Sequence, residues 1–171
     1  MHPAPLVCFA AIALSACSAY GGSGMERVDV PMRDAMGRDV GILVLTNTAG
    51  GLMLGGTLRG LPPGTHGIHV HTTGRCEPPF ETAGPHWNPM SRMHGLQNPE
   101  GPHLGDMPNV SVSADGSAMV SIVTAGGTLR GRDALLDGDG AAVVIHMSAD
   151  DNRSDPAGNS GSRIACGVVR G

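Results

Sequence analysis

The sequence predicts an all-β protein: an eight-stranded antiparallel β-sandwich or flattened barrel with Greek-key connections and two long functional loops. Apolar residues alternate with polar or small residues over short runs, which is typical of strands that bury one face. Turn-forming residues are abundant, with 27 glycines and 13 prolines among 171 residues. No stretch carries the long apolar stripe of an amphipathic helix.

The predicted strands follow one another along the chain with short turns between most of them. In the first, Val28, Val30 and Met32 alternate with charged or small residues, and Val40, Ile42 and Val44 repeat the pattern. Eight such runs suit a sandwich or barrel. They centre on residues 28–32, 40–44, 52–54, 68–70, 110–112, 119–123, 142–146 and 164–169. The segment 137–140, Asp-Gly-Asp-Gly, predicts a turn.

Two stretches interrupt this rhythm. Residues 72–107 are rich in proline and glycine, and residues 150–162 are polar and rich in glycine. Loops of this length in a compact domain are usually functional or disordered. Because both adjoin strands that carry histidine, we expect them to be functional.

Charge and composition exclude some classes of protein. The net charge is −4, and all 11 basic residues are arginine. A nucleic-acid-binding protein usually presents a basic face, so we expect no nucleic-acid partner. Aromatic residues are scarce, so the core must be built from aliphatic side chains and methionine.

The first 16 residues predict a signal peptide. Leu6–Leu14 is an apolar run of the right length for a signal core and too short for a transmembrane helix. It ends in Leu14-Ser15-Ala16-Cys17, which resembles the lipobox of bacterial lipoproteins, although no basic residue precedes the run. We therefore expect lipidation of Cys17, with a plain secretory signal as the alternative. Ser18, in the place of the aspartate associated with inner-membrane retention, favours the outer membrane.

Residues 17–25 then predict a flexible tether, and residues 26–171 form the predicted folded domain. Within that domain Cys76 and Cys166 are the two cysteines. An oxidising compartment favours their pairing over two free thiols. Closing a loop of this size stabilises the fold by roughly 4 kcal/mol in the chain-entropy model.

The histidines are the strongest functional signal. His69 and His71 lie two residues apart on a predicted strand, so both imidazoles point to one face. His86, His94, His103 and Asp106 follow in the proline-rich stretch. Three imidazoles and one carboxylate suit a four-coordinate zinc ion, although a loop aspartate is also compatible with a solvated turn. His146 ends an apolar run, which fits either a ligand or an edge histidine. We expect His66, by its alternation with Ile68, to be a core histidine.

These residues resemble a known family. The segments 67–71, 84–89, 94–95, 102–106, 144–146 and 158–168 resemble the copper–zinc superoxide dismutases in order, spacing and identity. The resemblance covers nearly all of the chain from Glu26. Nine residues separate Cys76 from His86, which is similar to the bacterial members. The predicted signal peptide implies a location in the periplasm or cell envelope.

The resemblance also implies a role for each site residue. Copper would be bound by four imidazoles, zinc by three imidazoles and a carboxylate, and one shared ring would bridge them. The copper set is His69, His71, His86 and His146, and the zinc set is His86, His94, His103 and Asp106. Asp150 would tie His69 to His94, and Arg163 would lie beside the open copper position. Cys76 and Cys166 would form the disulfide.

The implied activity is conversion of superoxide to molecular oxygen and hydrogen peroxide by Cu(II)/Cu(I) cycling, with His86 and Arg163 as the catalytic residues. Without lysine, Arg153 and Arg163 must attract the anion. One alternative is a non-catalytic periplasmic protein that stores copper or zinc. Another is a zinc hydrolase, which needs an open zinc position and a general base. The sequence leaves open whether the protein is a monomer or a homodimer.

Overall fold

The computed structural model describes residues 26–124, 126–131, 134–136 and 138–171. The predicted signal peptide, the tether and Cys17 lie outside the described residues, as does Asp137 of the predicted turn. None of the helical segments in the described part of the chain is long and apolar enough to cross a membrane.

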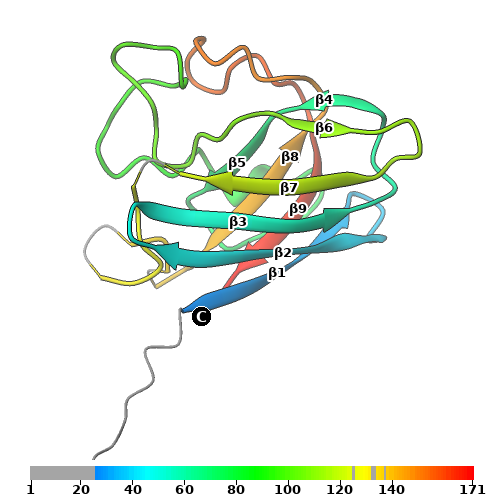
Figure 1. The fold of residues 1–171 in the computed structure, drawn as a ribbon, viewed down its shortest axis with the longest axis horizontal. Helices are drawn as coiled ribbons and strands as arrows, with labels where there is room; N and C mark the ends of the chain where they lie inside the picture. The colour runs from blue at the N-terminus through cyan, green and yellow to red at the C-terminus, as the bar shows by residue number, and fades with distance from the viewer. Residues whose placement is uncertain (1–25, 125, 132–133, 137) are drawn as a thin grey trace, which may run out of the picture.

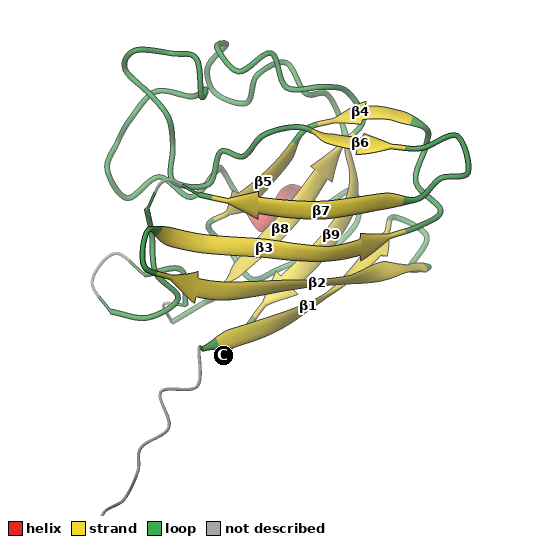
Figure 2. Cartoon of the chain, viewed as in Figure 1, coloured by secondary structure: helices red, strands yellow, loops and turns green. Residues whose placement is uncertain are grey.

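The described chain is built from strands, with one short 3-10 helix, η1 (Glu81–Ala83) (Figure 2). The strands are β1 (Arg27–Asp34), β2 (Asp39–Thr48), β3 (Gly51–Leu58), β4 (Gly64–His66), β5 (Ile68–His71), β6 (Val110–Val112), β7 (Ala118–Val123), β8 (Ala141–His146) and β9 (Arg163–Val169). All eight predicted runs are strands, which confirms the all-β prediction. The additional strand, β4, is separated from β5 by Gly67 alone.

The strands form a large curled antiparallel sheet and a small two-stranded one. Seven of them pair in the order β5-β8-β9-β1-β2-β3-β7, and β4 pairs with β6 in a two-stranded sheet. The layer of β1, β2, β3 and β7 faces the viewer in Figure 1, and β5, β8 and β9 cross behind it. β4 runs on into β5 at one edge of the large sheet, and a turn at residues 113–117 joins β6 to β7 at the other edge. The small sheet therefore helps to close the barrel.

The main core lies between these two layers. Along β1 buried and exposed residues alternate strictly, so Val30 and Met32 point inward. They pack with Leu43, Leu54 and Ile145, all of which are fully buried. Each such side chain contributes about 1.5–3 kcal/mol on removal from water. The predicted alternation thus holds on this side of the barrel.

Strand β8 departs from that pattern, because all six of its residues are buried. Its outward residues Ala142 and Val144 pack with Phe80 and Ala83 of the long loop and with Cys166. The loop 72–107 covers this outer face, so both sides of β8 are withdrawn from water. Cys76 and Cys166 form the expected disulfide, with their Cα atoms 5.6 Å apart, and it fixes the loop to β9.

Candidate metal centre

The candidate centre is assembled where the long loop runs along β5, which is the last strand of the large sheet. The Val70 amide donates to the Gly105 carbonyl at 2.9 Å, and the Trp87 amide donates to the Val70 carbonyl at 2.8 Å. A side chain at position 105 would collide with the Val70 carbonyl oxygen, so glycine permits this approach. The loop caps the edge of the sheet and brings His86 and Asp106 beside the histidines of β5.

A first set of four buried imidazoles converges at this edge. It comprises His69 and His71 of β5, His86 of the loop and His146 of β8, and their ligand atoms all lie within 4.8 Å of one another. Among the described residues, these four rings hold the buried side-chain nitrogens that lack a hydrogen-bond partner. The atoms are Nδ1 of His69 and Nε2 of His71, His86 and His146. Such unpartnered buried groups are costly, and a cation at their centre would satisfy all four.

Hydrogen bonds on the far side of each ring fix which nitrogen faces the centre. His71 Nδ1 donates to the Gly84 carbonyl at 2.8 Å, and His146 Nδ1 donates to the Gly161 carbonyl at 3.1 Å. A carbonyl can only accept, so in the neutral rings Nδ1 carries the proton and Nε2 presents its lone pair. His69 is turned the other way, because its Nε2 lies 2.7 Å from Asp150 Oδ2. The set therefore fits a metal ion.

Burial keeps the rings of His71, His86 and His146 neutral. Desolvation, with repulsion from neighbouring cations, lowers the pKa of His71 to about 2 and that of His146 to about 3. Burial likewise lowers the pKa of His86 to about 4, although Asp106 opposes the shift. Metal binding requires the deprotonated imidazole, so these nitrogens are ready to bind at neutral pH.

A second set shares His86 with the first. The Nδ1 atoms of His86, His94 and His103 lie 2.8, 3.0 and 3.2 Å from one oxygen, Asp106 Oδ1. A tetrahedral zinc ion with bonds of about 2.0–2.1 Å has ligand–ligand edges of about 3.3 Å. The other oxygen, Asp106 Oδ2, accepts from the Gly95 and His103 amides, at 2.9 and 3.0 Å. The carboxylate is thus fixed with one oxygen toward the three rings, and the set fits zinc.

The charges of the second set match a cation. Burial alone would raise the pKa of Asp106, but hydrogen bonds from His103, His86 and His94 hold it far below its usual range. For His94, burial lowers the pKa, yet the carboxylates of Asp106 and Asp150 outweigh it and raise the pKa to about 9. His94 therefore holds a proton at neutral pH in the metal-free site.

Asp150 links the two sets. Its Oδ2 lies 2.7 Å from His69 Nε2, and its Oδ1 lies 3.0 Å from His94 Nε2. These three residues could themselves surround a metal. We interpret them as two hydrogen bonds, because the opposite nitrogens of both rings already face the two ligand sets. Asn109 fixes the Asp150 backbone through two hydrogen bonds of 2.8 Å.

Arg163 lies opposite His146 because of a bulge in the β8–β9 pairing. Ile145 pairs with Ala165, but His146 pairs with Arg163, so Ile164 is the extra residue. The Arg163 guanidinium donates to the Phe80 carbonyl at 2.7 Å and to the Gly84 carbonyl at 2.9 Å. Its positive charge lowers the pKa of both His71 and His146, which places it near the first set.

The structure thus brings together all of the predicted ligands, Asp150 and Arg163. His66 lies outside both sets and is buried, with its ring nitrogens 2.9 Å from the carbonyls of His146 and Pro62, which confirms the core interpretation. Sequence reasoning missed Asp155, whose Oδ1 accepts from the His94 amide at 2.7 Å, and Asn109. No local pattern marks either residue. Sequence reasoning also assigned no role to the backbone carbonyls of Gly84 and Gly161, which accept hydrogen bonds from His71 and His146.

The fold and these sets define a class of protein: an antiparallel β-barrel with a candidate pair of metal sites that share one imidazole. Residues 40–169 match the family described as Copper/zinc superoxide dismutase (SODC). The chain is 44% identical over 138 residues to Superoxide dismutase [Cu-Zn] 2 of Aquifex aeolicus, covering 78% of this chain and 81% of that protein. This chain therefore belongs to the copper/zinc superoxide dismutase family.

Solved structures agree with that assignment. The crystal structure of a SOD-like protein from Bacillus subtilis superposes with a TM-score of 0.79 at 38% identity, covering 82% of this chain and 97% of that one. The Cu/Zn superoxide dismutase from Brucella abortus gives a TM-score of 0.70 at 31% identity, covering 84% and 99%. The eight-stranded prediction and its two loops thus agree with the family fold.

Proposed function

We propose that the protein is a copper–zinc superoxide dismutase that converts superoxide to molecular oxygen and hydrogen peroxide. The observation that carries this proposal is the position of His86 in both ligand sets. Its Nδ1 lies 2.8 Å from Asp106 Oδ1, and its Nε2 is one of the four unpartnered nitrogens of the first set. Family membership and the named activities of the relatives from Aquifex and Brucella support the same conclusion.

The chemistry of each set supports one metal for each. Four imidazoles suit Cu(II), so we assign copper to the first set. Three imidazoles and a carboxylate suit zinc, so we assign zinc to the second. The copper ligands are His69, His71, His86 and His146, and the zinc ligands are His86, His94, His103 and Asp106. His86 would bridge the two ions.

When bound, copper supplies a one-electron couple and zinc a fixed positive charge. Dismutation of two superoxide anions consumes two protons and yields one oxygen and one hydrogen peroxide. Arg163, held by two carbonyls beside the copper set, attracts and orients the anion. His86 Nε2 is the atom at which the chain can hold a proton close to the bound anion. Asp150 maintains the ring orientations of His69 and His94.

The alternative is a non-catalytic protein that stores copper or zinc. This alternative needs a test because one relative, from Bacillus subtilis, is named only a superoxide dismutase-like protein. A storage protein does not need an arginine beside its copper ligands. In this protein two backbone carbonyls hold Arg163 beside the copper set. A zinc hydrolase is less supported, because three imidazoles and Asp106 already supply the four ligands of a tetrahedral zinc ion and leave no open position for a water.

One experiment separates these functions. Superoxide-dependent turnover is measured for the protein loaded with copper and zinc, and again for His146→Ala and Arg163→Ala. We expect turnover to be abolished in the first variant and reduced in the second, with copper still bound in the second. A fully loaded wild-type protein without turnover would instead support storage.

We also propose that residues 1–16 are a lipoprotein signal peptide and that Cys17 carries a lipid, with residues 17–25 as a tether. The sequence Leu14-Ser15-Ala16-Cys17 supports this, as does the disulfide, which is typical of exported proteins. The protein would then lie in the periplasm, attached to the outer membrane. Incorporation of radiolabelled fatty acid, with Cys17→Ala as the control, tests the anchor.

A further inference from the structure

On the outer face of the sheet, opposite the candidate metal centre, the strands β2, β3 and β7 carry a single charged residue, Asp39, at the start of β2. The register of β2, β3 and β7 places nine outward residues in three rows. The rows are Ile42-Thr57-Met119, Val44-Gly55-Ser121 and Thr46-Met53-Val123. We call these nine residues the β2-β3-β7 face. An antiparallel sheet normally turns polar and charged residues toward water, so a face without charge needs an explanation.

Large apolar side chains project from this face into solvent. Met119 is 83% exposed, Val123 60%, Ile42 51% and Met53 41%. Buried methionines such as Met32 and Met107 fill gaps in the core, but exposed ones do not. Charged residues border the nine: Asp39 is exposed at the start of β2, and on the next strand, β1, Arg27 and Asp29 pair with each other at 2.8 Å. The face thus presents four large exposed apolar side chains among small uncharged residues, a composition that suits contact with an apolar surface.

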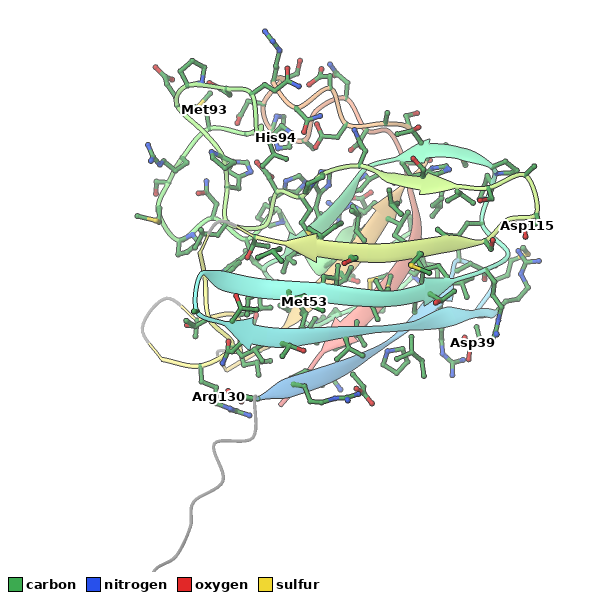
Figure 3. The ribbon with its side chains drawn as sticks, viewed as in Figure 1. Asp39, Met53, Met93, His94, Asp115 and Arg130 are labelled. Carbon is green, nitrogen blue, oxygen red and sulfur yellow. A yellow bond between two sulfur atoms is a disulfide. The ribbon has the colours of Figure 1, made fainter. Side chains whose placement is uncertain are left out.

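The chain enters the domain at one end of this face. Arg27 lies opposite Thr46, which lies opposite Met53, which in turn lies opposite Val123. Figure 1 shows β1 beginning at this end of the front layer, and Figure 3 labels Met53 on β3 there. Between Cys17 and Arg27 an extended chain spans at most about 35 Å. An anchor at Cys17 would therefore keep this end of the β2-β3-β7 face within reach of the bilayer.

The candidate metal centre lies on the other side of the barrel. Its ligands come from β5, β8 and the loop that covers the outer face of that layer. A surface in contact with the β2-β3-β7 face would leave the copper set and Arg163 facing away from it. Substrate access is thus compatible with such a contact.

We propose that the β2-β3-β7 face rests on the surface of the lipid bilayer to which the chain is anchored. This inference depends on the lipid anchor proposed above. The face measures about 14 by 17 Å, or about 250 Å², from the spacing of strands and residues. A stable dimer needs about 800 Å² from each partner, so the face is too small to hold a second copy. A tethered domain binds with a high effective concentration, so a small apolar patch suffices.

The test uses the lipidated full-length chain on phosphatidylcholine vesicles. A fluorescent thiol probe is placed at the centre of the face through Ser121→Cys, and its quenching by spin-labelled lipid is measured. The control probe is placed through Met90→Cys, at an exposed position (64%) in the loop 72–107. We expect quenching at position 121 to exceed that at position 90 by at least threefold. Equal quenching at the two positions overturns the proposal.

A matched pair of double variants tests the apolar side chains themselves. Met119→Glu with Val123→Glu should lower quenching at position 121 at least twofold, because the charges oppose contact with lipid. Met90→Glu with Met93→Glu adds the same charge in the loop 72–107 and should leave the quenching at position 121 unchanged. Quenching at position 121 that disappears when the protein is diluted on the vesicle overturns the proposal in favour of a protein partner. If the wild-type chain incorporates no fatty acid, the proposed lipid anchor is wrong. This result is distinct from a lipidated chain whose β2-β3-β7 face does not contact lipid, so the two proposals are tested separately.

Discussion

His71 and Arg163 donate hydrogen bonds to the same acceptor, the backbone carbonyl oxygen of Gly84, at 2.8 and 2.9 Å. One loop position therefore orients both a candidate copper ligand and the cation that attracts the substrate. Gly84 has φ of +76°, a region that favours glycine, and a Cβ there would lie 2.9 Å from Thr72 Oγ1. The disulfide fixes the same loop to β9, the strand that carries Arg163.

Replacing Gly84 with alanine should disturb both functions of its carbonyl. The left-handed backbone costs a residue with a Cβ about 1–2 kcal/mol, so the loop is expected to shift. We expect kcat/KM to fall about tenfold and copper affinity to fall with it. Turnover and copper competition assays measure these effects. Gly138→Ala is the control, because nothing lies near a Cβ at that position; equal losses in both variants would contradict the explanation.

Replacing Asp150 with asparagine should loosen both metals at once. An amide can accept a hydrogen bond from His69 or from His94 through its oxygen, but its NH2 group cannot accept the other. We expect the affinity for each metal to fall about 10- to 100-fold, measured against a competing chelator. Asp151→Asn is the control, since that exposed carboxylate accepts only from its own loop. Loss of one metal alone would show that Asp150 does not link the sets.

Removing the disulfide should destabilise the fold and release the loop. Cys76 and Cys166 are 90 residues apart, so the chain-entropy model gives about 4–5 kcal/mol. We expect Cys76→Ser with Cys166→Ser to lower Tm and to weaken copper binding, because the loop also positions His86. Reductant should lower the Tm of the wild-type protein and leave that of the double variant unchanged. An unchanged wild-type Tm under reductant would contradict this role.

The metal-free protein should lose stability on both sides of a narrow pH range. The pKa values of His71, His86 and His146 lie at about 2, 4 and 3, below the ordinary value of 6.5, so these buried rings stabilise the fold above pH 6.5. That contribution is lost as the pH falls from about 6.5 toward 2, because over this range the unfolded chain binds more protons than the folded chain. His94, with a pKa of about 9, has the opposite sign, and its contribution is lost as the pH rises from 6.5 to 9.

The measurement is Tm against pH for the protein treated with chelator. We expect a maximum near pH 6–7, with the steeper decline on the acid side, where three rings act together. The metal-loaded protein is the control, and its Tm should vary less between pH 5 and 8, since the bound metals hold the ligands deprotonated. A metal-free Tm that rises on acidification to pH 5 would contradict the sign.

Removing the charge of Glu81 should speed the reaction at low salt. Its carboxylate lies 3.6 Å from the Arg163 guanidinium and is largely exposed, so it opposes the attraction of an anion. We expect Glu81→Gln to raise kcat/KM about two- to fivefold at low ionic strength. Increasing salt should lower the wild-type rate and narrow this difference. Glu77→Gln, also in the loop, is the control; a wild-type rate that is flat or rises with salt would contradict electrostatic attraction.

Most of the strands could be predicted from alternation, but three features could not. Gly67 separates β4 from β5 because its amide and carbonyl bond to Ser148 and His146, distant residues that no local pattern reveals. Strand β8 is buried on both faces because a loop that precedes it by some 60 residues covers it. The connection between β7 and β8 was predicted only as a turn, yet it also supplies the buried core residues Leu129 and Leu135.

The sequence by itself determined the strand pattern, the cysteine pair and the identities of the candidate ligands, because residue type, spacing and order are local properties. Only the tertiary structure decided which nitrogen of each ring faces the centre. His69 presents Nδ1 and His71 presents Nε2, because Asp150 and the Gly84 carbonyl engage the opposite atoms. It also decided that Arg163, rather than Ile164, lies opposite His146, because a one-residue bulge shifts the register between two strands. Both decisions depend on hydrogen bonds between segments far apart along the chain, and such contacts exist only once the chain has folded.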